Sequence, residues 1–474
     1  MTENSETKSD LKIGEAMLPV ILLMGLLAYN IFYADGALLG DYSNQFILLI
    51  AAVCGLLLGF KHKIKFSLIA KDVLANLKSV TVPILILFLV GALAGTWLVS
   101  GVIPAMVYYG LQVLEPEIFL PASVVISAII SIATGSSWTT SATVGIALVG
   151  IGTALGIQPG MVAGAVISGA YFGDKMSPLS DTTNLAPAMA GTDLFTHIKY
   201  MSYTTIPTLV ITLLVFTIIS FNLETTGNAD LSEMLEVITD TFIISPWLFL
   251  VPATVVTLIL LKVKPLISLL SGIVLATVFA VVFQADVIRD LSETTQGALT
   301  NAILTDVQIY TENEALNRLF SSGGMSGMIW TILLIVCAMI FGGVLDGIGA
   351  LAIITKSLLK MTTSVFGLFA STVASCLGLN LIASDQYLAI VIPGKMFKQA
   401  YEDENLAPEN LSRTLEDSGT VTSVLIPWNT CGAYQSSVLG VSVSEYFVFA
   451  IFNYLSPITT LVFAALSIKI RKRI

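Results

Sequence analysis

Apolar stretches of membrane-spanning length recur along the chain from one end to the other. A helix needs roughly 17–25 apolar residues to cross the hydrocarbon core of a bilayer. The apolar blocks have this length, and polar loops separate them, so the pattern predicts a bundle of transmembrane helices. The expected spans are residues 16–34, 43–60, 80–100, 117–133, 201–222, 245–263, 265–284, 323–345 and 438–468.

Two long segments interrupt this regular pattern, residues 134–190 and residues 362–431. Both are apolar overall, yet both contain Gly, Pro, Ser, Thr, Asn and carboxylates. Irregular backbone is stable at membrane depth only where protein buries it or where it lines a polar cavity. We therefore expect re-entrant hairpins and broken helices in these two segments.

The composition agrees with a membrane protein. The 474 residues are 55% hydrophobic and 11% charged, whereas a soluble domain has about 25% charged residues. The predicted fold class is therefore an all-α polytopic membrane protein, with the lipid bilayer as its surroundings. No basic stripe is interleaved with aromatic residues, so we expect no nucleic-acid partner. The four cysteines form no CxxC pair and are predicted to be packing residues.

The positions of Lys and Arg predict how the chain is threaded. Basic residues are concentrated in residues 61–79 and 469–473, whereas residues 101–116 and 223–243 have none. Because basic loops stay on the cytoplasmic side, both termini are expected in the cytoplasm of a multi-pass cell-membrane protein. Residues 61–79 alternate Lys with apolar residues, which predicts an amphipathic helix on the inner surface.

The two halves of the chain contain similar segments at a spacing of about 243–250 residues. The first copy begins on the inside and the second on the outside, which predicts two repeats of inverted topology, as in many secondary transporters. The similar pairs are 87–103 with 336–352, 133–149 with 377–393, and 173–191 with 415–433. The expected organisation is a cytoplasmic tail (1–15), two transmembrane helices (16–60), the surface helix (61–79), the first repeat (80–222), connecting loops with two transmembrane helices (223–322) and the second repeat (323–474).

Polar groups inside the first irregular segment suggest a cation site. Pro178 discourages a continuous helix, and carboxylate, hydroxyl and amide oxygens are the ligands that hard cations prefer. The alternative is a loop in which Ser180 or Asp181 caps the next helix. The hydroxyl-rich stretch 134–143 fits a hairpin tip, although its hydroxyls can also bond to their own helix. The candidates are Asp174, Asp181 and Asn184 for ions or protons, with Thr182, Ser136, Ser137, Thr139 and Thr140 as neutral ligands.

The second irregular segment carries a corresponding set. An ionisable residue at membrane depth is costly and by default marks a functional site. Repulsion between the adjacent carboxylates of Glu416 and Asp417 favours protonation of one of them, which suits a proton carrier; a solvated loop is the alternative. The candidates are Asp385, Glu416, Asp417 and Asn429 for ions or protons, with Asn380 and Thr430 as neutral ligands.

Three motifs in these segments resemble the NhaC family of sodium/proton antiporters. They are GDKMSPLSDTTNLAPA at 173–188, LEDSGT at 415–420 and LIPWNTCGA at 425–433, within a resemblance that runs from about residue 16 to 470. The resemblance implies a scaffold domain and a moving transport domain in a homodimer. It also implies an ion site among the candidate residues, with sodium and protons as transported species and no cofactor. The family also contains exchangers of malate and protons for lactate and sodium.

These observations lead to one hypothesis and several alternatives. We expect a single buried site that binds either sodium or protons and faces the two sides of the membrane in turn. Asp181 is the first choice for the exchanging carboxylate and sodium ligand, and Asp174 is the second. An organic-carboxylate exchanger would use the hydroxyl-rich hairpin and residues 428–430, but Lys175 is the one intramembrane cation that the sequence suggests. A membrane enzyme is disfavoured because no HExxH motif or paired aspartate motif occurs, and a passive channel needs no inverted repeats.

Overall fold

The computed structural model describes residues 11–34, 38–40, 42–113, 115–223, 228–261, 263–360 and 364–473, so most of the predicted tail lies outside the described residues. The first half contains α1 (Ile13–Tyr33), α2 (Ser43–Lys61), α3 (Phe66–Ser79), α4 (Thr81–Val99), α5 (Val102–Val113), α6 (Pro116–Thr134), α7 (Ser137–Thr140), the π-helical turn η1 (Ser141–Gly145), α8 (Ile146–Ala154), α9 (Pro159–Met176), α10 (Asp181–Ala190) and α11 (Leu194–Phe221).

A middle section of shorter elements connects the two halves. It contains α12 (Asn228–Thr241), η2 (Pro246–Phe249), α13 (Leu250–Leu260), α14 (Pro265–Phe283), α15 (Ala285–Leu291), α16 (Thr295–Leu304), the antiparallel strands β1 (Val307–Gln308) and β2 (Ser321–Ser322), and α17 (Glu314–Leu319) between them. The second half contains η3 (Ser326–Met328), α18 (Ile329–Gly347), α19 (Ala350–Leu359), α20 (Val365–Ile382), α21 (Gln386–Asp403), α22 (Pro408–Leu415), the π-helical turn η4 (Glu416–Thr420), η5 (Ser423–Leu425), α23 (Thr430–Leu439), α24 (Val443–Tyr446), η6 (Phe447–Phe449) and α25 (Ile451–Ala465).

The hydropathy pattern predicted most of the transmembrane bundle, but residues 246–260 count as a span only together with residues 232–241, across a bend of 84°. Among the described residues, 8 helices are long and apolar enough to cross a membrane, or up to 10 if each bent pair counts as one span. The predicted long span 438–468 is bent by 51° between Phe449 and Ile451. One span, Val365–Ile382, lies within the segment that we expected to be irregular. The class of an all-α polytopic membrane protein is therefore confirmed.

The distribution of polar residues on α11 shows how the bundle fits a lipid environment. Thr204, Thr208 and Thr212, spaced four residues apart, are buried against other helices. On the opposite face, Val210 and Leu214 are about half exposed. Because lipid is as apolar as the exposed side chains, polar groups are best accommodated inside such a bundle. The helix therefore turns its hydroxyls inward, toward the middle of the protein.

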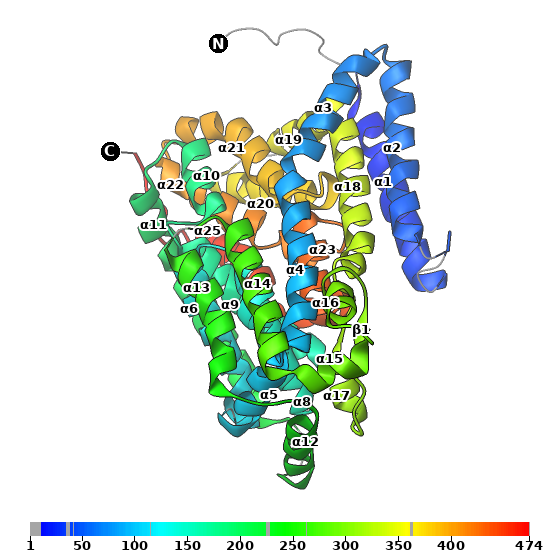
Figure 1. Ribbon diagram of the computed structural model, residues 1–474. Coiled ribbons are helices and arrows are strands. Elements are labelled where there is room, and N and C mark those ends of the chain that lie inside the picture. Colours follow the sequence, from blue (N-terminus) through cyan, green and yellow to red (C-terminus); the bar gives the residue numbers. More distant parts are fainter. Residues whose placement is uncertain are drawn as a thin grey trace.

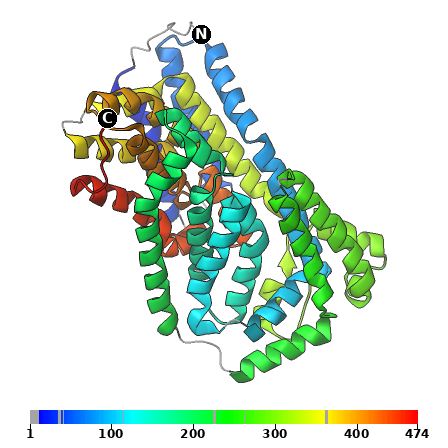
Figure 2. The ribbon, with the colours of Figure 1, turned by 90° about the vertical axis from the view of Figure 1, so that its left-hand side faces the viewer.

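The first helices of the two predicted repeats run in opposite directions. A single apolar helical segment of 34 residues, Phe66–Val99, contains α3 and α4, and α18 packs along it (Figures 1 and 2). Gly343 of α18 lies against Val73, and Gly347 lies against Ile69. Residue numbers rise along α18 as they fall along α3, so the two helices are antiparallel. This arrangement is what an inverted repeat requires, and the inversion of the complete repeats stays a prediction. The predicted surface helix corresponds to α3, which thus packs one face on α18.

Three hydrophobic cores meet around one stretch of the second half. The largest joins α4, α6, α8 and α9 to α14, α23 and α25, and it includes Val421. A second core joins α1, α2 and α18 to α20, and it includes Trp428. A third core joins α10, α20, α21 and α22, and it includes Leu415. Residues 415–428 therefore lie at the junction of the three cores, where the polar stretch 415–424 is buried in protein.

Close packing of α9 on α6 sets the position of the residues at the end of α9. A Cβ atom on Gly169 would lie 2.1 Å from the carbonyl oxygen of Val124, and one on Gly173 would lie 2.5 Å from that of Ala128. The absence of side chains at these two positions allows the helix backbones to approach, as small residues do in many membrane bundles. This packing places Asp174, which follows Gly173, near the C-terminal end of α6.

We predict that Gly169→Ala destabilises the protein, whereas Gly378→Ala does not. The new methyl group at position 169 would overlap the α6 backbone, which costs about 1–3 kcal/mol. Gly378 on α20 has no atom within 4 Å of its Cβ position, so the same substitution there has only the favourable effect of helix propensity, up to ~1 kcal/mol. Apparent melting temperatures of the purified proteins in detergent would measure the difference. Equal values for the two variants would contradict this account of the packing.

Candidate functional site

Two breaks in the first half place polar groups in the interior. The helix α6 ends at Gly135, whose φ of 71° is left-handed, and Ser136 then caps α7 by accepting a hydrogen bond from the Thr139 amide. Further along, α9 ends at Met176, and Ser180 caps α10 by accepting from the Thr183 amide. The predicted hairpin tip and broken helix are thus both present.

The second half contains the same two breaks at an interval of 249 residues. Ser384 has a left-handed φ of 59°, as Gly135 has, and Asp385 then caps α21 by accepting from the Leu388 amide at 2.9 Å. Asn429 caps α23, at the position that corresponds to Ser180. Each half therefore contributes one hairpin tip and one helix N-terminus to the interior.

Asp174 joins the first hairpin tip to the first broken helix. Its Oδ2 atom accepts hydrogen bonds from the backbone amide of Ser137 at 3.2 Å and from the Ser137 hydroxyl at 2.7 Å. The side chain is 7% exposed, and its partners are neutral. A carboxylate held in this way at a helix N-terminus keeps its charge accessible to a cation, because amide and hydroxyl donors stabilise it without neutralising it.

Glu416 lies in the π-helical turn η4 and faces α10. Its Oε1 atom accepts a hydrogen bond from the Thr182 hydroxyl at 3.0 Å, and its Oε2 atom is buried without a hydrogen-bond partner among the described residues. Turns of π-helix occur frequently at functional sites. The next residue of α10, Thr183, donates to the Asp174 carbonyl at 3.1 Å, so the start of α10 contacts both carboxylate residues, which come from opposite halves of the chain.

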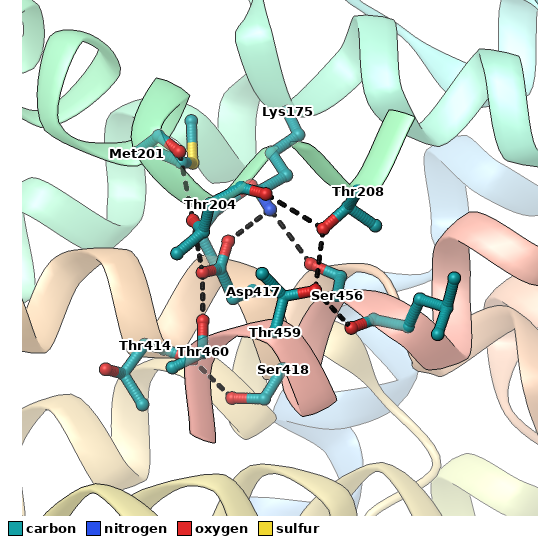
Figure 3. A network of polar contacts seen from close by, with 12 residues as sticks. Lys175, Met201, Thr204, Thr208, Thr414, Asp417, Ser418, Ser456, Thr459 and Thr460 are labelled. Atoms are coloured by element: carbon teal, nitrogen blue, oxygen red, sulfur yellow. Dashed lines mark hydrogen bonds and ion pairs between the residues drawn. The ribbon is translucent and has the colours of Figure 1, made fainter. Parts of the chain in front are cut away.

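Asp417, the next residue, lies in a network with Lys175, Thr204 and Thr460 (Figure 3). Its Oδ1 atom forms an ion pair with the Lys175 ammonium group, and both side chains are fully buried. Its Oδ2 atom accepts hydrogen bonds from Thr204 of α11 at 2.8 Å and from Thr460 of α25. Lys175 also donates to Ser456 at 3.0 Å. This pair is therefore charge-balanced, and both partners make further hydrogen bonds to neighbouring hydroxyls.

The charge balance of the interior is negative. Among the described residues, no ion pair involves Asp174, Glu416 or Asp385, and all three side chains are buried. Successive residues on a helix point about 100° apart. Lys175 therefore turns away from Asp174, and Asp417 turns away from Glu416. Of these four residues, Lys175 and Asp417 form an ion pair with each other. The other two, Asp174 and Glu416, form no ion pair with a basic side chain.

Amide side chains connect the second hairpin to the unwound chain after η4. Asn380 donates to the Gly419 carbonyl at 2.6 Å and to the Thr422 hydroxyl at 3.0 Å. Asn429 donates to the Asn380 carbonyl at 3.0 Å. The amide of Thr430 donates to the Ser384 carbonyl at 3.0 Å. These three candidate residues thus satisfy backbone groups that the helix breaks leave free.

Asp181 and Asn184 are the two candidates that lie on the surface. Both are exposed on α10, and Asn184 donates to the carbonyls of Pro178 and Ser180 at 2.9 and 2.7 Å, as a local cap does. Asp181 interacts electrostatically with Asp174, so it lies near the buried site without being part of its interior.

The hydroxyls of the first hairpin have two roles: the Ser137 hydroxyl binds the Asp174 carboxylate, and others bind carbonyls of their own helix. Thr140 donates to the Ser136 carbonyl at 2.9 Å, which is the alternative of bonding within the helix. Thr139 is half-buried, with its carbonyl accepting from Thr143.

The sequence did not predict Thr204, Thr460 and Ser456 as partners of the buried ion pair. The four-residue spacing of threonines on α11 is the signal that would have found the first.

Buried carboxylates and broken helices in the middle of an apolar helix bundle are the features of a polytopic secondary transporter. A family model described as the Na+/H+ antiporter family matches residues 169–468. This chain belongs to that Na+/H+ antiporter family, which confirms the resemblance found in the motifs.

Three curated relatives illustrate the range of the family. The chain is 40% identical over 90% of both chains to "Na(+)/H(+) antiporter NhaC" of Alkalihalophilus pseudofirmus. It is 36% identical to "Na(+)/H(+) antiporter NhaC" of Bacillus subtilis, over 83% of this chain and 86% of the relative. It is also 36% identical to "Malate-2H(+)/Na(+)-lactate antiporter" of Bacillus subtilis, over 91% of each.

We predict that Lys175→Met and Asp417→Asn each destabilise the protein more than the double substitution does. Removing one member of a buried ion pair leaves an uncompensated charge, which costs about 3–5 kcal/mol, whereas removing both leaves none. Apparent melting temperatures in detergent would compare the three variants, with Ser456→Ala as a control that removes only one hydrogen bond of Lys175. Additive losses in the double variant would contradict a direct pairing.

Proposed function

We propose that this protein is a secondary active transporter that exchanges sodium ions for protons across the cell membrane by alternating access. The observation that carries the proposal is the pair of buried carboxylates, Asp174 and Glu416, that come from opposite halves, border the start of α10 and form no ion pair among the described residues. A buried carboxylate in a low-dielectric interior must be neutralised by a proton or a cation. Competition of the two for the same oxygens would couple their opposite movements.

Asp174 and Glu416 are the exchanging carboxylates in this proposal, with Ser137 and Thr182 as neutral ligands. Sodium is a hard cation and prefers such oxygen donors. The described residues contain no group of three or more His, Cys, Asp or Glu side chains arranged to hold a metal ion. The sodium site would therefore combine the two carboxylates with hydroxyl and backbone oxygens. Asp181, the first choice from sequence, would act at the exposed entrance to the site.

The orientation and assembly of the protein are part of the proposal. Both termini would lie in the cytoplasm, because the lysines of α3 and the basic C-terminal residues obey the positive-inside rule. With this orientation, an inward proton gradient would drive sodium out of the cell. The family resemblance also supports a homodimer in which one domain moves against a fixed scaffold.

Exchange of organic carboxylates is the second candidate, and the relative named as a malate/lactate antiporter favours it. The buried site argues against it, because Asp174 and Glu416 would repel an organic anion. Arg413, which the sequence analysis did not count, is fully buried. Its guanidinium lies over the Tyr200 ring at 4.7 Å and donates to the Lys469 carbonyl, so it belongs to the α11 side of α22 and not to the hairpin tips.

We predict that Asp174→Asn and Glu416→Gln each abolish sodium-driven proton movement, because an amide cannot exchange a proton for a cation. Asp181→Asn keeps exchange with an apparent sodium affinity about two- to fivefold weaker, as expected for an exposed charge. The measurement is the response of a pH-sensitive dye inside proteoliposomes to an imposed sodium gradient. Asp290→Asn, at an exposed position on α15, is the matched control with unchanged exchange.

The same assay separates the two candidate functions when malate and lactate are added. Sodium exchange predicts proton movement with sodium alone and no increase with the carboxylates. Proton movement that requires malate or lactate would overturn the proposal in favour of organic-carboxylate exchange. Full activity of Asp174→Asn would show that Asp174 is not an exchanging group.

A further inference from the structure

A basic pocket opens near the C-terminal end of the chain, apart from the buried carboxylates. It encloses about 400 Å3 between the first turns of α11 and the segment that follows α25. Figure 1 shows this C-terminal segment at the end of the bundle where α10 and α22 also lie. The pocket is lined by Thr196, Lys199, Tyr200, Tyr203, Lys469, Ile470 and Arg471.

The charge of the pocket is positive. Lys199 and Lys469 take part in none of the ion pairs of the described residues, and the Lys469 ammonium lies over the Tyr203 ring at 4.7 Å from its centre. Arg471 pairs with Glu409 at 2.8 Å, yet its side chain remains 52% exposed. Three cationic groups with one carboxylate partner therefore surround the opening.

The C-terminal wall of the pocket is fixed by backbone hydrogen bonds. The Arg471 amide donates to the Tyr200 hydroxyl at 3.1 Å, and the Arg471 carbonyl accepts from Asn410 at 2.6 Å and from the Ala407 amide at 2.9 Å. Leu406 and Lys472 form an antiparallel bridge. The segment is thus an ordered part of the protein, which holds its basic side chains in place beside α11.

Exposed apolar side chains adjoin the pocket residues in the chain. Phe195 and Leu466, which flank them in the sequence, are 73% and 65% exposed, and the apolar outer face of α11 begins at Ile206 one turn beyond Tyr203. Tyrosines are typical of the membrane–water interface, where the ring is apolar and the hydroxyl is wet. A ligand in the pocket can therefore have a charged group among the lysines and an apolar part along α11.

We propose that this pocket binds a phosphate group, supplied by the headgroup of an anionic phospholipid. Lysine ammonium groups bind phosphate as point charges, and basic pockets at the ends of transmembrane helices suit anionic headgroups. The adjoining apolar face of α11 offers a surface for the acyl chains. The site is separate from the exchanging carboxylates, so the inference does not depend on which substrate the protein carries.

Native mass spectrometry of the full chain, released from detergent with added lipid, tests the proposal. We expect bound phosphatidylglycerol in preference to phosphatidylcholine. Lys199→Gln/Lys469→Gln should weaken phosphatidylglycerol binding by roughly 25-fold, about fivefold for each lysine. Lys356→Gln/Lys360→Gln, in the last turn and at the C-cap of α19, is the matched control with unchanged binding, since it removes the same charge elsewhere. Equal loss in the two double variants, or no preference over phosphatidylcholine, would overturn the proposal.

Competition distinguishes the source of the phosphate. Potassium phosphate and potassium chloride are added at equal ionic strength to the complex with phosphatidylglycerol. Retention of the lipid in both salts identifies the headgroup as the ligand, and displacement by phosphate alone identifies a phosphate site that soluble phosphate also fills. Displacement by both salts alike would show general charge attraction and would contradict a built site. Unchanged melting temperatures would verify that the double variants are folded.

Discussion

Burial of carboxylates away from water is the constraint on which the rest of the structure depends. A charged group in a low-dielectric interior is stable only if another charge or strong donors compensate it. Asp417 is compensated within the protein by Lys175 and two threonines. Asp174 and Glu416 receive neutral donors alone. The charges of these two carboxylates can therefore be neutralised by a proton or a sodium ion.

The fold creates this arrangement by breaking helices at corresponding places in its two halves. Left-handed residues, Gly135 and Ser384, end the long helices, and capping side chains begin the next ones. Free amides and hydroxyls at these breaks supply the neutral donors. Because three hydrophobic cores meet at residues 415–428, the broken segment of the second half is largely buried in protein, as irregular backbone at membrane depth requires.

The sequence predicted the helices and the breaks, because both depend on local features. Hydropathy over about 20 residues marks a span, and Pro178 and the hydroxyl-rich stretch mark interruptions. Which side chains face the interior was not predictable in the same way. Asp181 was preferred to Asp174, yet Asp181 is exposed and Asp174 is buried. Likewise, Lys175 could be named as an intramembrane cation, but its partner Asp417 comes from the other half of the chain through tertiary packing.

The most direct test of the account is whether sodium binding displaces protons from the purified protein. In a weakly buffered detergent solution with a pH indicator, added sodium chloride should acidify the medium, whereas choline chloride at the same concentration should not. The release should disappear in a protein that carries both Asp174→Asn and Glu416→Gln. Sodium binding, measured with radioactive sodium, that releases no protons from the wild-type protein would contradict competition for a shared site.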